Sequence, residues 1–331
     1  MSRTSLWVNL VVLIVTSSLG AGCLTVRERV GVRGGATHEW SRPGDWFTLT
    51  QHAPNGWRDL PPVLLVGELG LGPEQFDLGG RGLAPYLARR GFDVFALTWR
   101  PPPGAHLAQL FEQEAVEALR IAAANEPAIV VGYGVGGAAA FVQAAESPER
   151  VRGVVALAVP LDAAVPNDAL AAVARAVARS KADFVPLAAL APLGWGGADL
   201  YATLLTHGSA FAPGVSEAMR AALTDVPVTV LADVAGWMSS GDLRLAAEPS
   251  YRAAAAAVTA PVLAICGVAD NVVHAEAALV PEALPKSHAT FEILQRLELS
   301  SDGYAHLALV QGAAAPAEVW ARIASFAEAM R

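Results

Sequence analysis

The chain has 331 residues, of which 53% are hydrophobic and 16% are charged. This composition is typical of a packed protein with one large domain, or one domain carrying an insertion, and it excludes a disordered chain. The formal net charge of -8 provides no basic stripe to neutralise phosphates, so the sequence argues against a nucleic-acid partner.

Residues 1–22 have the pattern of a signal peptide. Arg3 forms a short basic region, and the apolar stretch 6–19 is too short to span a bilayer as a helix. The segment Leu19-Gly20-Ala21-Gly22-Cys23 then resembles the lipobox of bacterial lipoproteins, although its leucine stands one position early. The resemblance implies a lipid anchor at Cys23. A plain secretory signal and a retained N-terminal anchor are the alternatives.

In bacterial lipoproteins the residues after the lipidated cysteine determine whether the protein stays in the inner membrane or moves to the outer membrane. Leu24 is not an acidic retention signal for the inner membrane, so the resemblance implies the outer membrane, facing the periplasm. If Cys23 is acylated, the second cysteine, Cys266, has no partner for a disulfide. Cys266 lies in an apolar run, so we expect a buried, unreactive thiol. The sequence has no cysteine–histidine cluster with metal-ligand spacing, and it predicts neither a metal nor a cofactor.

The remaining chain predicts alternating strands and helices. Residues 24–44 are expected to form a mobile linker, and residues 45–51 a first strand. Short apolar runs predict buried strands at 63–66, 93–99, 128–131, 154–159, 261–266 and 291–294, and helical spacing predicts helices at 83–90, 107–124, 138–146 and 316–330. This alternation is typical of an α/β fold with a mostly parallel sheet flanked by helices.

One long segment breaks the alternation. Residues 163–255 are rich in alanine at helical spacing and are interrupted by prolines. They predict a helical cap inserted over the carboxyl edge of the sheet, so that residues 45–162 and 256–331 form the core. The alanines at 253–257 indicate close helix packing.

A glycine-rich turn carries the first functional signal. Gly132-Tyr133-Gly134-Val135-Gly136-Gly137 follows a predicted strand and precedes a predicted helix. This context resembles the nucleophile elbow of the α/β-hydrolase fold, which places a serine or cysteine above the sheet. Here the residue at that point is Gly134, which has no side chain. The backbone N–H of Val135 remains as an oxyanion-hole donor, and Glu68 or Leu69 would supply the second N–H.

Two further residues complete the order nucleophile, acid, histidine. Asp270 follows an apolar strand, where a carboxylate can accept a hydrogen bond from a histidine ring and hold its tautomer. His306 lies after the last predicted strand and before the last helix. Asp270 could also cap its turn, and His306 could be a core histidine. His274 and Asp302 are rivals for the two roles.

A finer resemblance rests on several segments. Five segments resemble the start of the catalytic domain of poly(3-hydroxyalkanoate) synthases: Pro62 to Val66, Phe76-Asp77-Leu78, 83–87, 91–95 and Trp99-Arg100. A sixth, Val159-Pro160-Leu161-Asp162, resembles the end of a later strand in that domain. In that family a cysteine occupies the position of Gly134 and carries the acyl group as a thioester. The resemblance covers about residues 61–162 and 261–312, and it implies hydroxyacyl-coenzyme A chemistry that Gly134 cannot support.

Three functions therefore remain open. The first is a lipoprotein without turnover that binds a small apolar acyl or ester-like ligand, or a partner protein. The second is a hydrolase- or lyase-type enzyme that uses only the Asp270–His306 pair as a general base. The third is a hydrolase with a displaced nucleophile, namely Ser239, Ser240 or Ser301, although none of these lies in an elbow sequence.

Overall fold

The computed structural model describes residues 25–30, 36–41, 44–54, 56, 60–161, 181–191, 199, 201–245, 250–278, 289–294 and 303–331. The signal peptide and the predicted lipidation site, Cys23, lie outside these ranges. So do Ser301, Asp302 and most of residues 162–200.

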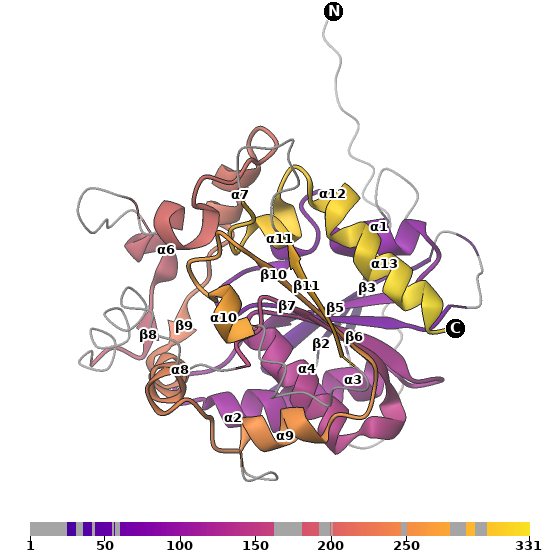
Figure 1. Cartoon of the computed structure of the whole chain (residues 1–331), viewed down its shortest axis with the longest axis horizontal. Coiled ribbons are helices and arrows are strands. Elements are labelled where there is room, and N and C mark those ends of the chain that lie inside the picture. Colours follow the sequence, from indigo (N-terminus) through magenta and orange to yellow (C-terminus); the bar gives the residue numbers. More distant parts are fainter. Residues whose placement is uncertain are drawn as a thin grey trace, which may run out of the picture.

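A single twisted sheet runs through the described part of the molecule (Figure 1). It has nine strands in the order β1-β2-β3-β5-β4-β6-β7-β10-β11. From β5 to β11 all neighbours are parallel, whereas β1, β2 and β3 join the edge beside β5 in antiparallel fashion. The strands are β1 Thr25–Val30, β2 Ala36–Ser41, β3 Phe47–His52, β4 Val63–Val66, β5 Val94–Trp99, β6 Ala128–Tyr133, β7 Val151–Leu157, β10 Val262–Gly267 and β11 Ala289–Leu294. The predicted mostly parallel α/β sheet is confirmed.

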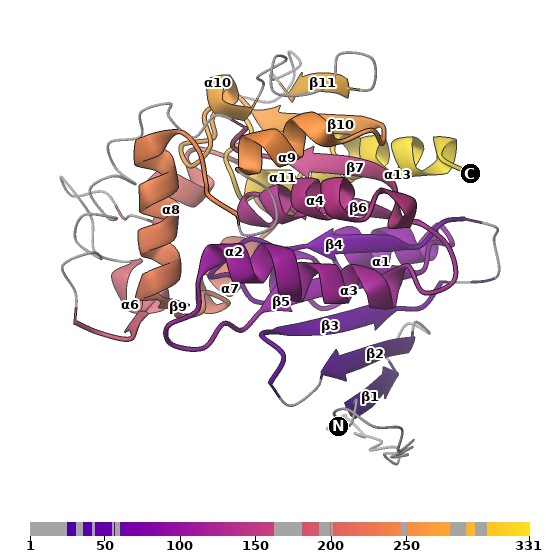
Figure 2. The same ribbon diagram turned by 90° about the horizontal axis from the view of Figure 1, so that it is seen from below.

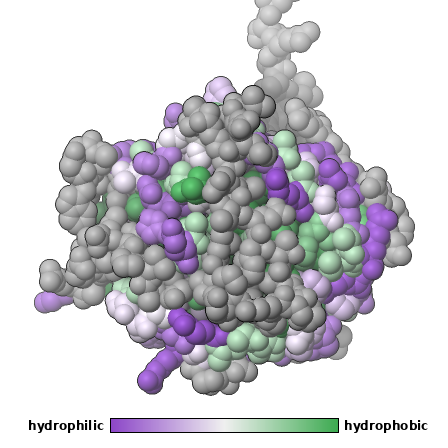
Figure 3. All heavy atoms as spheres, viewed as in Figure 1, coloured by the Kyte–Doolittle hydropathy of each residue, from purple (hydrophilic) through white to green (hydrophobic). Residues whose placement is uncertain are grey.

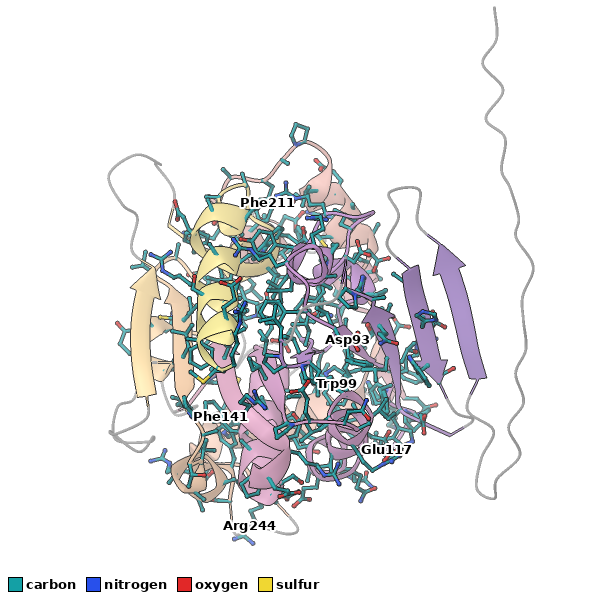
Figure 4. All side chains as sticks on the ribbon, turned by 90° about the vertical axis from the view of Figure 1, so that its right-hand side faces the viewer. Asp93, Trp99, Glu117, Phe141, Phe211 and Arg244 are labelled. Carbon is teal, nitrogen blue, oxygen red and sulfur yellow. The ribbon has the colours of Figure 1, made fainter. Side chains whose placement is uncertain are left out.

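The central strands are apolar because both faces of the sheet are covered. Every residue of β4, β5, β6 and β10 is buried, as a parallel sheet between two helical layers requires. In Figure 2, α3, α4 and α9 lie on one face of the sheet, and α1 and α13 lie on the other. The two hydrophobic clusters follow the same division, one including Phe141 and Tyr251, the other Leu87 and Trp320. Figure 4 shows Trp99 and Phe141 within this packed interior.

The core helices include every one that the sequence predicts, and two short ones, at residues 275–278 and 308–311, that it does not. They are α1 Leu83–Arg89, α2 Leu107–Gln109, α3 Ala115–Ala122, α4 Val135–Glu146, α9 Tyr251–Ala257, α10 Ala275–Ala278, α11 Ala308–Gln311, α12 Ala315–Glu318 and α13 Trp320–Ala329. A π-helical segment, Leu110–Glu114, joins α2 to α3. Pro316 lies in the first turn of the separate short helix α12, where proline is tolerated, and α13 begins afterwards at Trp320.

The inserted segment covers one end of the sheet. It contains β8 Phe184–Val185, α6 Leu187–Leu190, a π-helical segment Ala202–Thr206, α7 Val215–Ala221, β9 Val226–Pro227 and α8 Val228–Ser240. Figure 2 shows α6, α8 and β9 together beyond one end of the parallel strands. The segment is not purely helical, since β8 and β9 form a small antiparallel sheet. Its predicted boundary at residue 255 falls within α9, whose Ala254 and Ala255 are buried in the core cluster.

The predicted mobile linker at residues 24–44 is wrong where the structure describes it. Residues 25–30 and 36–41 form β1 and β2, which pair with each other and then with β3. The two strands stand at one edge of the sheet, opposite β11 (Figure 4). Polar strands are stable here because the backbone of β3 offers unpaired N–H and C=O groups, which bond irrespective of side-chain polarity.

Cys266 is fully buried in β10, and burial raises the pKa of its thiol to about 12. It is therefore protonated and unreactive at neutral pH, as the sequence predicts. On the face seen in Figure 3, hydrophilic and hydrophobic residues interleave among the described atoms. Within the described ranges, no helix is both long and apolar enough to cross a bilayer.

Candidate functional site

The turn between β6 and α4 has the geometry of an elbow. Gly134 adopts φ 55° and ψ −124°, a backbone conformation that strains any residue with a side chain. Its N–H donates to the carbonyl of Leu157 at 2.9 Å. Gly136 permits the close approach of the first turn of α4 to β4, because a Cβ there would lie 2.3 Å from the carbonyl oxygen of Gly67. The elbow therefore keeps its shape without a nucleophile.

Asp270 and His306, the predicted pair, are brought together. Asp270 Oδ2 lies 2.8 Å from His306 Nδ1, and both side chains are fully buried. The other carboxylate oxygen, Oδ1, accepts the N–H groups of Val272 and Val273 at 2.8 and 2.9 Å. These two bonds fix the carboxylate, which in turn fixes the ring so that Nε2 points toward the elbow.

The sequence points to Glu68 only for its backbone N–H, and it gives no indication of the role of the Glu68 side chain. Its Oε2 accepts the N–H of Val135 at 3.1 Å and lies 3.3 Å from His306 Nε2. Its Oε1 accepts the N–H of Leu69 at 2.7 Å. The N–H groups of Val135 and Leu69, two of the predicted oxyanion-hole donors, thus both bind this one carboxylate. The third candidate, the N–H of Glu68, donates to Gln75 Oε1 at 2.8 Å instead.

Glu68 occupies the space of the missing nucleophile. A Cβ built on Gly134 would lie 1.6 Å from Glu68 Oε2 and 3.3 Å from His306 Nε2. A serine or cysteine at position 134 and the observed carboxylate therefore exclude each other. No local pattern in the sequence could have found this role, because the reach of Glu68 into this space depends on the fold.

The loop that carries Glu68 is held on several sides. Gln75 is fully buried, and its Nε2 donates to the carbonyls of Leu71 and Gly72 at 3.1 Å each. Trp99 Nε1 donates to the carbonyl of Gly67 at 2.8 Å. Gln311, from α11, donates to the carbonyl of Gln75 at 3.1 Å. This network positions the backbone from which Glu68 reaches the elbow.

The charges around His306 favour its protonated form. Burial on its own lowers the pKa of the imidazole, but the carboxylates of Asp270 and Glu68, one at each ring nitrogen, outweigh burial and raise the pKa to about 10. The ring is then an imidazolium at neutral pH, and both its N–H groups are engaged. Tyr133 stacks on this ring with centroids 4.7 Å apart.

An apolar cavity of about 230 Å³ opens from this charged cluster toward the inserted segment. Glu68 and His306 line one part of it. The remaining wall is almost wholly aliphatic and comes largely from α6, α8 and the segment between them, including Leu187, Leu190, Leu204, Leu231, Val234 and Met238. The hydroxyl of Tyr201, another lining residue, donates to the carbonyl of Ser216 at 2.8 Å. The site thus joins an aliphatic chamber to a single polar contact point.

The rival residues are engaged elsewhere. Ser239 Oγ donates to the carbonyl of Ala235 within α8, and Ser240 Oγ donates to the carbonyl of Asp242. His274 lies just before α10, where its carbonyl accepts the N–H of Ala277. Since Asp270 and Glu68 take both ring nitrogens of His306, neither described serine is paired with this base. In the described ranges, no three His, Cys, Asp or Glu side chains are grouped so that they could hold a metal ion.

Comparison with known proteins agrees with this architecture. The model of the family described as alpha/beta hydrolase fold matches residues 63–313. A search of curated protein sequences finds no match.

Solved structures with a similar fold include a monoacylglycerol lipase from Paleococcus ferrophilus (TM-score 0.58, 18% identity, covering 86% of this chain and 99% of that one). A hydrolase from Pseudomonas aeruginosa is also similar (TM-score 0.54, 20% identity, 91% and 97% covered). So is a 2-hydroxy-6-oxo-6-phenylhexa-2,4-dienoate hydrolase from Rhodococcus (TM-score 0.56, 18% identity, 93% and 99% covered). At these identities the likeness establishes the fold.

Proposed function

From the premise that this chain belongs to the alpha/beta hydrolase fold family, we propose that it binds a small apolar acyl or ester-like ligand without transferring an acyl group through position 134. One observation carries the proposal. The aliphatic cavity ends at an elbow that has no side chain and whose free space is taken by Glu68. At about 230 Å³ the cavity is smaller than the roughly 300–1,000 Å³ of pockets for drug-sized ligands, so the ligand is small.

The absence of a side chain at Gly134 supports a function without covalent acyl transfer. Removing the nucleophile of a serine protease costs about 10⁶ in kcat, and what remains comes from the oxyanion hole and substrate binding. In this chain the N–H of Val135 is also occupied by Glu68. An ester carbonyl therefore finds neither an attacking atom nor a free donor there.

The alternative is an enzyme in which the Asp270–His306 pair acts as a general base. A base must be neutral before it accepts a proton, and a pKa of about 10 leaves little neutral His306 at pH 7. For this reason we favour binding over turnover. A rate that rises toward pH 10 and is lost in His306→Ala would favour the alternative.

Binding and turnover can be measured on the same preparation. We expect the detergent-solubilised full chain to bind methyl octanoate in calorimetric titration, with a negative heat-capacity change from apolar burial. We also expect no hydrolysis of p-nitrophenyl octanoate above the buffer rate. Hydrolysis that His306→Ala abolishes would overturn the proposal, and so would an absence of any apolar binding.

A cavity-filling variant with a matched control assigns the binding to this chamber. Ala235 lines the cavity from α8, whereas Ser239, one turn further along the same helix, is exposed and does not line it. Ala235→Phe is expected to weaken methyl octanoate binding at least about tenfold, since the added ring takes up the ligand's volume. Ser239→Phe adds the same ring outside the chamber and should bind as the wild type does.

Within the family, we propose kinship with poly(3-hydroxyalkanoate) synthases. The segments from Pro62 to Trp99 and the elbow sequence support it, with Gly134 in the place of the acyl-carrying cysteine. The acyl character proposed for the ligand follows from this kinship. Binding of short 3-hydroxyacyl esters in preference to unrelated esters of equal size would support it, and equal binding would count against it.

We also propose a lipid anchor at Cys23 and an outer-membrane location facing the periplasm. The support is the sequence Leu19-Gly20-Ala21-Gly22-Cys23 followed by Leu24. Metabolic labelling with an alkyne-bearing fatty acid in a bacterial host is expected to mark the wild type and not Cys23→Ser. Labelling of both proteins, or of neither, would contradict the anchor.

A further inference from the structure

We propose that Glu68 restricts the ligands of this cavity to uncharged ones, with a preference for those that carry a hydroxyl group, and that it excludes free carboxylic acids. The inference rests on the proposed function, because it names the class of ligand for the same cavity. The carboxylate of Glu68 stands where the negatively charged oxygen of a bound acid would stand. The protein thus carries its own anion in the anion site.

The hydrogen bonds of Glu68 identify it as the occupant of that site. Its carboxylate accepts the backbone N–H groups of Val135 and Leu69, and it lies 3.3 Å from Nε2 of His306, which carries a proton when the ring is an imidazolium. A free acid entering from the aliphatic chamber would need these same donors. None of them is available while Glu68 is in place.

The charge balance opposes an acid as well. Glu68 and His306 line the cavity, and Asp270 pairs with His306 behind them. With His306 protonated, the two acidic side chains outnumber the cation by one beside an aliphatic wall. Coulomb repulsion between like charges a few ångströms apart is strong where water is largely excluded, and the Glu68 side chain is only 12% exposed.

The same carboxylate offers one favourable contact. Each carboxylate oxygen can accept more than one hydrogen bond, and Glu68 lines the cavity. A ligand hydroxyl at this point would donate to it, and a charge-assisted hydrogen bond of this kind is stronger than a neutral one. An ester lacks the donor, so it would rely on apolar burial alone.

Three probes of one chain length separate these effects. For the full-length protein at pH 7.5 we expect 1-octanol to bind most tightly, methyl octanoate less tightly, and octanoate at least about tenfold more weakly than the ester. Octanoate binding as tightly as methyl octanoate would overturn the inference and leave the proposed function standing. If none of the three binds, the proposed function itself fails.

Variants of Glu68 test the cause. Glu68→Ala frees the N–H groups and the imidazolium, so octanoate is expected to become the tightest ligand of the three. Glu68→Gln keeps the volume without the charge, and it should reduce the discrimination against octanoate. This variant provides the test if Glu68→Ala fails to fold. Glu74→Ala removes an acidic side chain from the same loop but outside the cavity lining, and should keep the wild-type order. Unchanged discrimination in both Glu68 variants would refute the assignment.

Discussion

The two sides of the His306 ring are built in different ways. On the Nδ1 side, Asp270 follows β10 and is locked by two backbone N–H groups, in the arrangement expected of a histidine–carboxylate pair. On the Nε2 side, the partner is the side chain of Glu68, which reaches across from the loop after β4 into space left open by Gly134. One side is thus fixed by its own turn, whereas the other is filled by a neighbouring element. The difference teaches that an elbow without a side chain can still be occupied, here by a residue from another loop.

The largest expected effect is on the locked side. Asp270→Ala leaves a buried imidazolium without its closest partner, and removing one member of a buried ion pair costs about 3–5 kcal/mol. Glu68→Gln, on the more accessible side, should cost only about 1 kcal/mol, because an amide can still accept the N–H of Val135. Urea unfolding of both variants measures the contrast. Equal losses would show that the two sides are alike.

We expect that two substitutions together make the filled side reactive. Glu68→Ala combined with Gly134→Ser is expected to raise hydrolysis of p-nitrophenyl octanoate about 10²-fold above the wild type, because the serine then meets a His306 that has a single carboxylate partner. Gly134→Ser alone should remain close to the wild-type rate, since its Cβ collides with Glu68. Labelling by a fluorophosphonate, located by mass spectrometry, reports on the serine directly. A fully active single variant would mean that Glu68 does not block the elbow.

The pH dependence of stability measures both partners together. The pKa of His306 is raised from about 6.5 in the unfolded chain to about 10 in the fold, so its contribution is complete below pH 6.5 and is lost as the pH rises through 10. The expected loss is at most about 1.4 kcal/mol per pH unit in that window. His306→Gln should flatten the curve between pH 7 and pH 10. A wild-type curve that is already flat there would contradict the double pairing.

The smallest effect is expected from the ring that stacks on His306 without pairing with either nitrogen. The hydroxyl of Tyr133 is buried and has no hydrogen-bond partner among the residues that the structure describes. Tyr133→Phe keeps the stack, so stability should change by no more than about 1 kcal/mol, in the stabilising direction. Thermal unfolding at pH 7 is sufficient to detect it. A marked loss of stability would mean that the hydroxyl of Tyr133 has a hydrogen-bond partner and contributes to holding His306.

Much of this arrangement can be predicted from local sequence. The apolar runs that form β4, β5, β6 and β10 predict a buried parallel sheet, and the glycines around Gly134 predict a tight turn before a helix. Asp270 and His306 follow strands, and parallel strands bring their carboxyl ends to one edge. Topology therefore predicts that the two residues can meet, whereas the choice between them and their rivals, His274 and Asp302, needs the structure.

Other features depend on distant contacts. Glu68 has its role because Gly134, 66 positions further along the chain, has no side chain and leaves space for the Glu68 carboxylate. No local sequence pattern predicts this contact. Strands β1 and β2 are polar, and they form because β3 offers an open edge. The pairing of β8 with β9 joins two-residue segments far apart in sequence. In each case the determining partner lies outside any window that a periodicity argument examines.

The shared space of Gly134 and Glu68 also constrains how this sequence can change over generations. A side chain restored at position 134 meets the carboxylate first, and removal of Glu68 alone leaves an empty anion site beside a charged ring. Neither step taken singly is expected to support covalent chemistry. The two positions are therefore coupled, and covalent chemistry at position 134 is expected to need both substitutions in the same protein.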